Sequence, residues 1–369
     1  MKTLSYFSLL AVASSVFCEM PVAPITPSAQ PKVENAIDAA FSIDFIYWNI
    51  RKTNQAYAIN SAFLFDPVGF PEYAQPVGHG HTYYPAYSYE PGFKLGLGLD
   101  FEHDDWDLFT RYTRLHTPKL NSNVSVYGDI GENELNYTAG INSFNFIVDG
   151  LTTGGALDFN GFNHSQYKFD IIDLELGRNY HLSEFFIVRP SFGLKAAWTK
   201  SNWFSSFNTF FNQAGTVENL THTSFVENNF NIGIRSALET TKVIYQGFSL
   251  YSHAAFSVLN ASQKIHYKTR VISTEEDVTD ATNYKNLTLN QNYLAPVVEL
   301  GLGFAYNTLF NNDKYRIGLA AGWEFQYWNG NDYLYPLSNQ ATSSIPQNFS
   351  LGQGTFSIQG LDISLKLDF

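Results

Sequence analysis

The 369-residue chain contains a single cysteine, Cys18, which excludes an intrachain disulfide. Charged residues make up only 15% of it, against the roughly 25% of an average soluble domain. Beyond the N-terminal segment no run of about 18 apolar residues occurs, which excludes membrane-spanning helices. Aromatic residues, by contrast, reach 17%, with 23 Tyr and 32 Phe. A chain of this composition would have to cross a membrane as a β-barrel.

The first residues have the features of a secretory signal peptide, which we expect to span 1–18. Lys2 is followed by an apolar stretch that ends at Phe17, with small residues near its end. Cys18 lies at the expected cleavage point, so the exported chain should have no thiol, and the bulky Phe17 before it argues against a lipoprotein site. Residues 19–39 contain four prolines and no apolar periodicity, which predicts a flexible periplasmic lead-in.

Strict alternation of apolar and polar residues recurs along the rest of the chain. The last nine residues, LDISLKLDF, place five apolar side chains on one side: Leu361, Ile363, Leu365, Leu367 and Phe369. The stretches FSIDFIY at 41–47 and FKLGLGLDF at 93–101 repeat the pattern. Such alternation indicates β-strands with one apolar and one polar face. The summed apolar faces far exceed the patch that a soluble sandwich tolerates, so we expect them to contact lipid.

The spacing of these segments predicts an all-β, transmembrane, antiparallel up-and-down β-barrel of about ten strands over residues 40–369. The predicted strands are 40–52, 91–101, 104–117, 164–180, 184–201, 227–241, 246–262, 291–308, 313–328 and 353–369. Short turns alternate with long connections at 53–90, 118–162, 203–225, 263–289 and 329–352. Outer-membrane barrels show this asymmetry, with short periplasmic turns and long extracellular loops. Residues 55–64 and 141–148 could add a hairpin, which would give twelve strands.

The C-terminal segment predicts how the barrel closes. In hydrocarbon an unpaired strand edge costs several kcal/mol for each orphaned backbone group, so the last strand should pair with the first. We therefore assign the apolar residues from Leu361 to Phe369 to barrel closure, and the terminal aromatic to the signal read by the outer-membrane insertion machinery. In two strands the alternation changes phase, at Ile171–Ile172 and at Gly360–Leu361, which suggests a β-bulge at each.

The polar face of each predicted strand should line the lumen. Its charged members are Asp44, Lys94, Asp100, Arg111, Asp173, Glu175, Arg189, Lys195, Arg235, Glu239, Glu299, Arg316, Glu324 and Lys366. They could form a conduit whose charges select ions, or a plugged interior held by salt bridges, which narrow barrels need. For any single residue we favour the salt-bridge role. Phe109 also falls on the inward phase, and inward glycines such as Gly96 and Gly98 would leave room in the lumen.

Several stretches resemble the Legionella-type major outer-membrane protein family, which has relatives in chlamydia-like bacteria. The stretches are DFIYWNI, GFKLGLG, DDWDLFTRYTRLHT, IIDLELGRNY, RPSFGLKAAW and GFSLYSHAAFSVL, which together span about 40–260. The C-terminal hairpins follow the family pattern more loosely. The resemblance implies a pore-forming β-barrel and no enzyme activity.

These observations favour a porin-like barrel that lets small solutes or ions diffuse across the outer membrane and supports the envelope. The alternative is a surface adhesin that acts through its extracellular loops. A less favoured alternative is a rim protease, which would need His116 or His266 to meet Asp158 or Asp280, and no motif fixes them there. We expect no cofactor and no metal site.

The net charge of −12 disfavours nucleic acid as a partner. The expected partners are outer-membrane lipid and lipopolysaccharide, the outer-membrane insertion machinery, periplasmic chaperones, and small solutes or ions. The sequence leaves open whether the chain forms a homo-oligomer.

Overall fold

The computed structural model describes residues 37–53, 58–64, 75–101, 106–130, 138–140, 155–213, 215–245, 247–275, 278–312, 314–333 and 353–369. The predicted signal peptide and nearly all of the predicted lead-in lie outside these ranges. Within them, no helix is long and apolar enough to cross a membrane.

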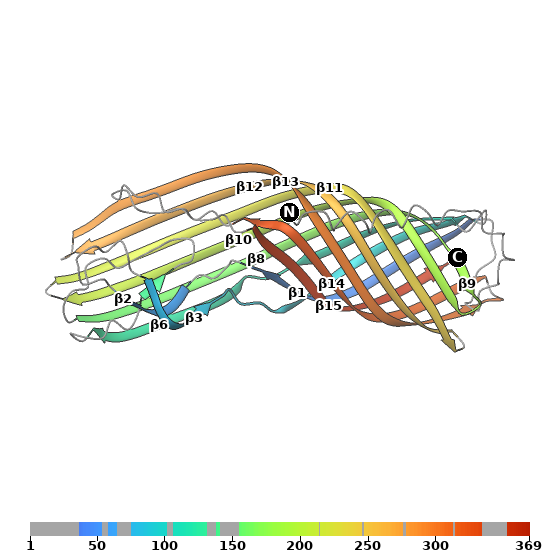
Figure 1. Cartoon of the computed structure of the whole chain (residues 1–369), viewed down its shortest axis with the longest axis horizontal. Helices are drawn as coiled ribbons and strands as arrows, with labels where there is room; N and C mark the ends of the chain where they lie inside the picture. The colour runs from blue at the N-terminus through green and yellow to red at the C-terminus, as the bar shows by residue number, and fades with distance from the viewer. Residues whose placement is uncertain are drawn as a thin grey trace, which may run out of the picture.

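Ten of the strands in the described ranges close into a ring (Figure 1). They are β1 (Ile37–Lys52), β4 (Tyr89–Phe101), β5 (Trp106–His116), β8 (Gly155–Arg178), β10 (Phe186–Gln213), β11 (Gly215–Tyr245), β12 (Phe248–Glu275), β13 (Val278–Phe310), β14 (Tyr315–Tyr333) and β15 (Gln353–Asp368). In that order each strand pairs antiparallel with the next. The predicted up-and-down barrel of ten strands is confirmed.

The ring closes where β15 pairs with β1, the first and last strands of the barrel. Phe41 lies opposite Leu367, and Tyr47 lies opposite Leu361. The backbone N–H of Phe369 donates to the carbonyl of Ala39 at 2.9 Å, and the N–H of Ala39 donates back at 2.8 Å. The C-terminal segment therefore lies in the sheet up to its last residue, and its backbone groups are paired on both sides by β1 and β14.

The other strands of the described ranges lie outside the ring. β6 (Leu120–Ile130) pairs with β8 beyond the end of β5, and β9 (Tyr180–Ser183) pairs with β10. β2 (Ala58–Leu64), β3 (Gln75–Tyr83) and β7 (Thr138–Gly140) form a separate three-stranded sheet. The suggestion that a hairpin of residues 55–64 and 141–148 joins the ring is wrong for β2, and residues 141–148 lie outside the described ranges.

The two ends of the barrel differ in their connections. We call the end where β1 begins and β15 ends the terminal end, and the opposite one the distal end. At the terminal end, short turns join β11 to β12 and β13 to β14. Gly247 in the first turn has a φ of 85°, and Asn311 and Asn312 in the second have φ values of 56° and 55°. Glycine and asparagine are the residues that adopt this left-handed conformation most readily.

At the distal end, long hairpins replace two of the predicted loops. β10 and β11 remain paired up to Gln213 and Gly215, and β12 and β13 up to Glu275 and Val278. The predictions of loops at 203–225 and 263–289 are therefore wrong. Figure 1 shows the ends of both hairpins at the far left, opposite the C-terminus.

The outer surface of the terminal half is apolar, as the alternation predicted. Each of the ten strands exposes large apolar side chains there, among them Phe41, Leu97, Trp106, Leu174, Phe192, Ile234, Phe256, Leu302, Leu319 and Leu365. Phe192 is 71% exposed and Ile234 is 68% exposed. A continuous belt of this kind is the surface that a barrel presents to lipid tails.

In the distal half the alternation inverts, and the apolar side chains point inward. Nine of the ring strands contribute large side chains that are at most 5% exposed: Trp48, Leu115, Phe169, Trp203, Phe225, Ile265, Val297, Trp328 and Phe356. The distal half of the barrel is therefore filled by packed side chains, as in a water-soluble protein: a large apolar cluster, with buried polar residues such as Asn163 and Glu227 beside it.

This inversion explains the two phase changes in the sequence. The described pairing of β8 with β5 and with β10 shows no register shift at Ile171–Ile172. The pairing of β15 with β1 and with β14 likewise shows none at Gly360–Leu361. Both predicted bulges are wrong, because Ile171 and Ile358 continue the inward face as members of the core. The strands keep their phase while the solvent outside them changes from lipid to water.

Candidate functional site

Three aromatic rings close the lumen in the distal half. Phe169 of β8 packs edge-on against Trp328 of β14 with ring centroids 5.5 Å apart, and against Phe356 of β15 at 5.6 Å. β8 and β14 lie on opposite sides of the ring, so this contact spans the barrel. Phe169 and Trp328 are fully buried. We call Phe169, Trp328 and Phe356 the aromatic layer.

An ion-pair layer lies directly below the aromatic layer, on its terminal side; it comprises Asp173, Glu175, Lys195, Arg235 and Glu299. The Lys195 Nζ lies 2.8 Å from Asp173 and 2.9 Å from Glu299. Arg235 pairs with Glu175, and lies 3.1 Å from Glu299. The Lys195 ammonium also lies 5.7 Å from the Trp328 ring centroid, so the two layers are in contact. Lys195 is fully buried, whereas the walls of a water-filled pore would be exposed.

Further ion pairs connect strands across the lumen. Lys52 of β1 lies 2.8 Å from Glu227 of β11, on the opposite side of the ring. Lys94 of β4 pairs with Glu324 of β14, and its Nζ lies 2.5 Å from Asp362 of β15.

Arg189 of β10 makes a similar set of contacts. Its guanidinium lies 2.7 Å from Asp107, 3.4 Å from Glu175 and 3.3 Å from Glu239. These four side chains come from β10, β5, β8 and β11, so they connect four neighbouring strands from the inside. Charges removed from water in this way are stabilised only when they are paired, as they are here.

A polar cavity of about 280 Å³ lies in the terminal half. The described residues that line it include four basic side chains, Lys94, Arg111, Arg316 and Lys366, and four carboxylates, Asp44, Glu239, Glu324 and Asp362. Its lining charges therefore balance.

Glycines make room for bulky inward side chains in this region. A Cβ on Gly96 would collide with the Phe109 ring, and one on Gly301 would collide with the His253 ring. Phe109 thus occupies the space that its predicted inward phase required. The space beside these glycines is therefore occupied by neighbouring aromatic and imidazole rings, and it does not add open volume to the lumen.

The structure places the candidate lumen residues on the inner face of the barrel. Asp173, Glu175, Lys195, Arg235 and Glu299 form the ion-pair layer, and Asp44, Lys94, Arg111, Glu239, Arg316, Glu324 and Lys366 line the cavity. Arg189 bridges to Asp107, and Asp100 lies near the terminal end, opposite Asp38 and Asp107.

Sequence reasoning missed two kinds of lumen residue. Lys52, Asp107 and Glu227 are inward charges that an extension of the same alternation would have found. The same alternation did not reveal the aromatic layer. Phe169 and Phe356 lie in segments where the apolar residues were expected to face lipid, and where the change of phase was explained by a bulge.

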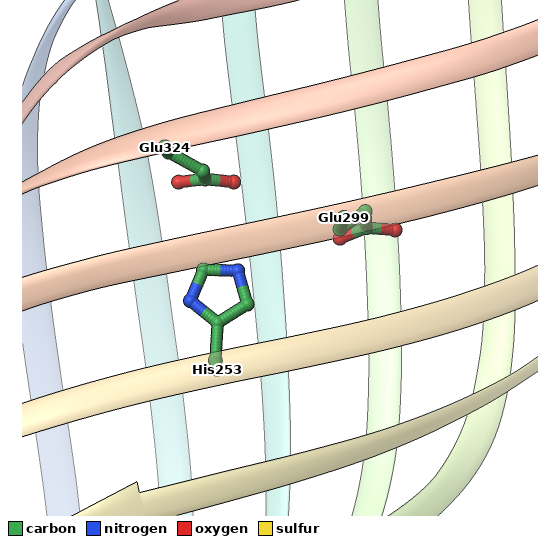
Figure 2. A group of neighbouring side chains, drawn as sticks. All are labelled: His253, Glu299 and Glu324. Carbon is green, nitrogen blue, oxygen red and sulfur yellow. The ribbon is translucent and has the colours of Figure 1, made fainter.

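His253, Glu299 and Glu324 come together in the lumen and invite comparison with a metal site. They lie on β12, β13 and β14, with one potential ligand atom from each within 4.8 Å of the others (Figure 2). Both carboxylates already have cationic partners: Lys195 and Arg235 on Glu299, and Lys94 on Glu324. A metal ion would have to compete with these buried cations, so the arrangement favours ion pairing.

The histidines of the rim-protease alternative are separate and lie on the outside of the barrel. The Nε2 of His116 lies 2.8 Å from Asp170, and the Nδ1 of His266 lies 3.0 Å from the Thr288 hydroxyl. Asp158 and Asp280 lie at the far ends of β8 and β13, and their side chains are outside the described ones.

The sequence profile of the family described as Legionella pneumophila major outer membrane protein precursor matches residues 29–369, nearly the whole chain. No protein with a curated description matches this chain.

Solved structures of other barrels are similar only in broad outline. The outer membrane protease OmpT of Escherichia coli is 9% identical, with 90% of this chain and 96% of that chain covered and a TM-score of 0.32. A Pseudomonas aeruginosa FadL homologue is 9% identical over 91% of this chain and 90% of its own, with a TM-score of 0.21. The Pseudomonas putida toluene transporter TodX is 7% identical over 92% of both chains, with a TM-score of 0.22. With scores this low, none of the three carries an argument about this chain.

Proposed function

The chain belongs to the family of the Legionella pneumophila major outer membrane protein and lies in the bacterial outer membrane, and from this premise we propose that it is a pore for small polar solutes and ions. The terminal end faces the periplasm and the distal end faces the cell exterior, as in other barrels with short periplasmic turns. The lumen is shut in this conformation by the aromatic layer, so passage requires that layer to move.

The observation that carries this proposal is the charge-lined cavity of about 280 Å³ in the periplasmic half. A barrel that served only as a scaffold would gain stability by filling this space with close-packed side chains, as the distal half does. Because the cavity walls carry equal numbers of acidic and basic groups, we expect weak selectivity between anions and cations.

The aromatic layer is the element that we expect to act as the gate. Its three rings pack against one another, with a hydrogen bond from the Trp328 indole to Gln326 at 3.2 Å, and hydrophobic constrictions of this kind can control conduction by excluding water. The ion pairs beneath it can exchange partners when water enters, because Lys195 and Arg235 share both Asp173 and Glu299.

Single-channel recording of the refolded protein in planar bilayers tests the proposal. The wild type should show rare openings with a reversal potential close to zero in a salt gradient. The double variant Phe169→Ala/Phe356→Ala removes two rings of the gate and should open far more often. Phe192→Ala, on the lipid-facing surface, is the matched control and should behave as the wild type. Silent membranes with both the wild type and the double variant would refute the proposal.

The projecting hairpins favour a second candidate function, surface adhesion. β11, β12 and β13 are 31, 28 and 33 residues long, whereas about 9–11 residues suffice for a strand to span the membrane. Replacing residues 210–218 with Asn-Gly would shorten one hairpin beyond its core-packed part. An adhesive role predicts that beads coated with this variant lose binding to cultured eukaryotic cells while its conductance is unchanged. If beads coated with the variant bound as well as beads coated with the wild type, this hairpin would be excluded as the adhesive element.

We propose no catalytic role for the chain. Among the described side chains, His116 and His266 have separate partners on the outer surface. Incubation of the refolded protein with a mixture of unstructured peptides should yield no cleavage, and cleavage lost in His116→Ala or His266→Ala would contradict this assignment.

A further inference from the structure

A basic patch lies on the outer surface of the barrel, where three neighbouring strands leave the apolar belt. We define it by Arg114 and His116 of β5, Lys168 of β8 and Lys200 of β10. His116 lies directly opposite Lys168, and Lys168 lies directly opposite Lys200. Arg114 and Lys200 are exposed, and His116 and Lys168 are half-buried. Four groups that can carry positive charge therefore share one small area of a chain whose net charge is −12.

Within the protein the two lysines of the patch are poorly compensated, whereas Arg114 lies directly opposite Asp170. Directly opposed residues on one face of an antiparallel pair have Cβ atoms roughly 4.5–5.5 Å apart, and like charges at that position repel. Among the described residues, no carboxylate lies within ion-pair distance of Lys168 or Lys200. The nearby Asp170 already accepts from Tyr112 at 2.7 Å and lies 2.8 Å from His116. An external anion between the two lysines would remove this repulsion.

The position of the patch identifies the anion. Toward the terminal end, Trp198 is the outward position next to Lys200 on β10, and Ile172 and Tyr112 are two outward positions from Lys168 and His116. Ile172 and Trp198 are exposed members of the lipid-facing belt. Trp198 packs against Phe230 at 5.4 Å, as expected of the aromatic girdle at a membrane interface. The patch therefore lies at the level of the lipid head groups, on the side that faces the cell exterior. The head group of that leaflet is the phosphorylated disaccharide of lipid A.

We propose that this patch binds the phosphate groups of lipid A. One phosphate lies between the ammonium groups of Lys168 and Lys200, whose long stems let the charges adjust to it. The guanidinium of Arg114, two residues along β5 from His116, offers bidentate hydrogen bonds to the second phosphate. The acyl chains then run along the apolar surface that includes Ile172 and Leu174. The proposal depends on the outer-membrane location and on the orientation given under Proposed function, and not on conduction.

Native mass spectrometry of the full-length protein in detergent tests the proposal, with purified lipid A as the ligand. We expect the double variant Lys168→Gln/Lys200→Gln to bind bis-phosphorylated lipid A roughly 30-fold more weakly than the wild type, from the contribution of a basic residue near a charged membrane surface. Lys168→Arg/Lys200→Arg should retain binding. The control Lys264→Gln/Lys268→Gln removes two exposed lysines further out on β12 and should bind as the wild type does.

Two further arms separate the possible sources of the phosphate. Dephosphorylated lipid A, which also loses the phosphate at Arg114, should bind the wild type at least as weakly as phosphorylated lipid A binds the double glutamine variant. Millimolar inorganic phosphate should not displace bound lipid A. Equal affinity for the two forms of lipid A, displacement by free phosphate, or unchanged affinity in the double glutamine variant would each overturn the proposal. The substitutions are on the outer surface, and sheet content measured by circular dichroism confirms that each variant folds.

Discussion

Replacement of Lys195 by methionine tests whether the lumen is dry. The change keeps a side chain of similar length and removes the ammonium that lies 2.8 Å from Asp173 and 2.9 Å from Glu299. The two carboxylates are then left with Arg235 as their shared cation, at 3.8 Å and 3.1 Å. Removing one partner from a buried ion pair costs about 3–5 kcal/mol, whereas an exposed pair is worth about 0–1 kcal/mol. Because Lys195 is fully buried, we expect the larger cost, and because Arg235 remains we place it at about 3 kcal/mol.

The assay is equilibrium unfolding in urea of the protein refolded into lipid vesicles, followed by tryptophan fluorescence. A second variant, Lys195→Met with Asp173→Asn and Glu299→Gln, removes the uncompensated charges and should recover most of the lost stability, since neutral polar groups cost less to bury than ions. A loss below about 1 kcal/mol for the single variant would mean that water reaches Lys195, and the closed lumen would be refuted.

Other substitutions test the packing. Phe207→Ala should lower the free energy of unfolding by about 3–5 kcal/mol, because the Phe207 side chain is buried on the inner face of the β10–β11 hairpin. The control Ser206→Ala changes the neighbouring side chain on the outer face and should have little effect. If urea unfolding gave small effects for both variants, this segment would be a loop. Gly96→Leu should prevent refolding, as judged by sheet content in circular dichroism, because its side chain would meet the Ser42 hydroxyl and the Phe109 ring. Adding Ser42→Gly and Phe109→Ala should restore folding, and a failure to do so would place the obstruction elsewhere.

Much of the fold could be predicted from the sequence because one physical rule, apolar toward lipid, holds along the terminal half of every strand. The stretch from Leu361 to Phe369 alternates without a fault because lipid lies on one side of it and the polar lumen on the other. The rule fails where the strands leave the membrane. There Trp203, Phe207 and Phe225 turn inward, so their segments looked irregular and were predicted to be loops.

For the candidate site, the sequence could predict which charged residues face the lumen but not which of them pair. A charge such as Lys195 or Glu299 on the polar phase of a strand can only point into the lumen. Its partner cannot be predicted, because Lys195 and Glu299 lie on strands three steps apart in the ring and meet only through the width of the barrel. The Phe169–Trp328 contact depends in the same way on the barrel diameter, which a single sequence does not state.

The same inversion links the structure to the proposed function. A strand such as β8 carries lipid-facing Leu174 and inward Asp173 in one half, and water-facing Lys168 and inward Phe169 in the other. Members of the ion-pair layer, the aromatic layer and the basic patch therefore follow one another along this single strand. Each lies where the surroundings of that strand change.

Spin labelling along β12 tests the inversion most directly. Single cysteines introduced from Ala254 to Lys268, in a chain whose native cysteine is Cys18, would carry a nitroxide whose contact with oxygen reports lipid and with a nickel chelate reports water. We predict oxygen access at 254, 256 and 258, nickel access at 260, 262 and 264, and neither at the inward positions 259, 261 and 265. Nickel access at those inward positions would contradict the closed distal core, and oxygen access that continued to 264 would contradict the change of solvent.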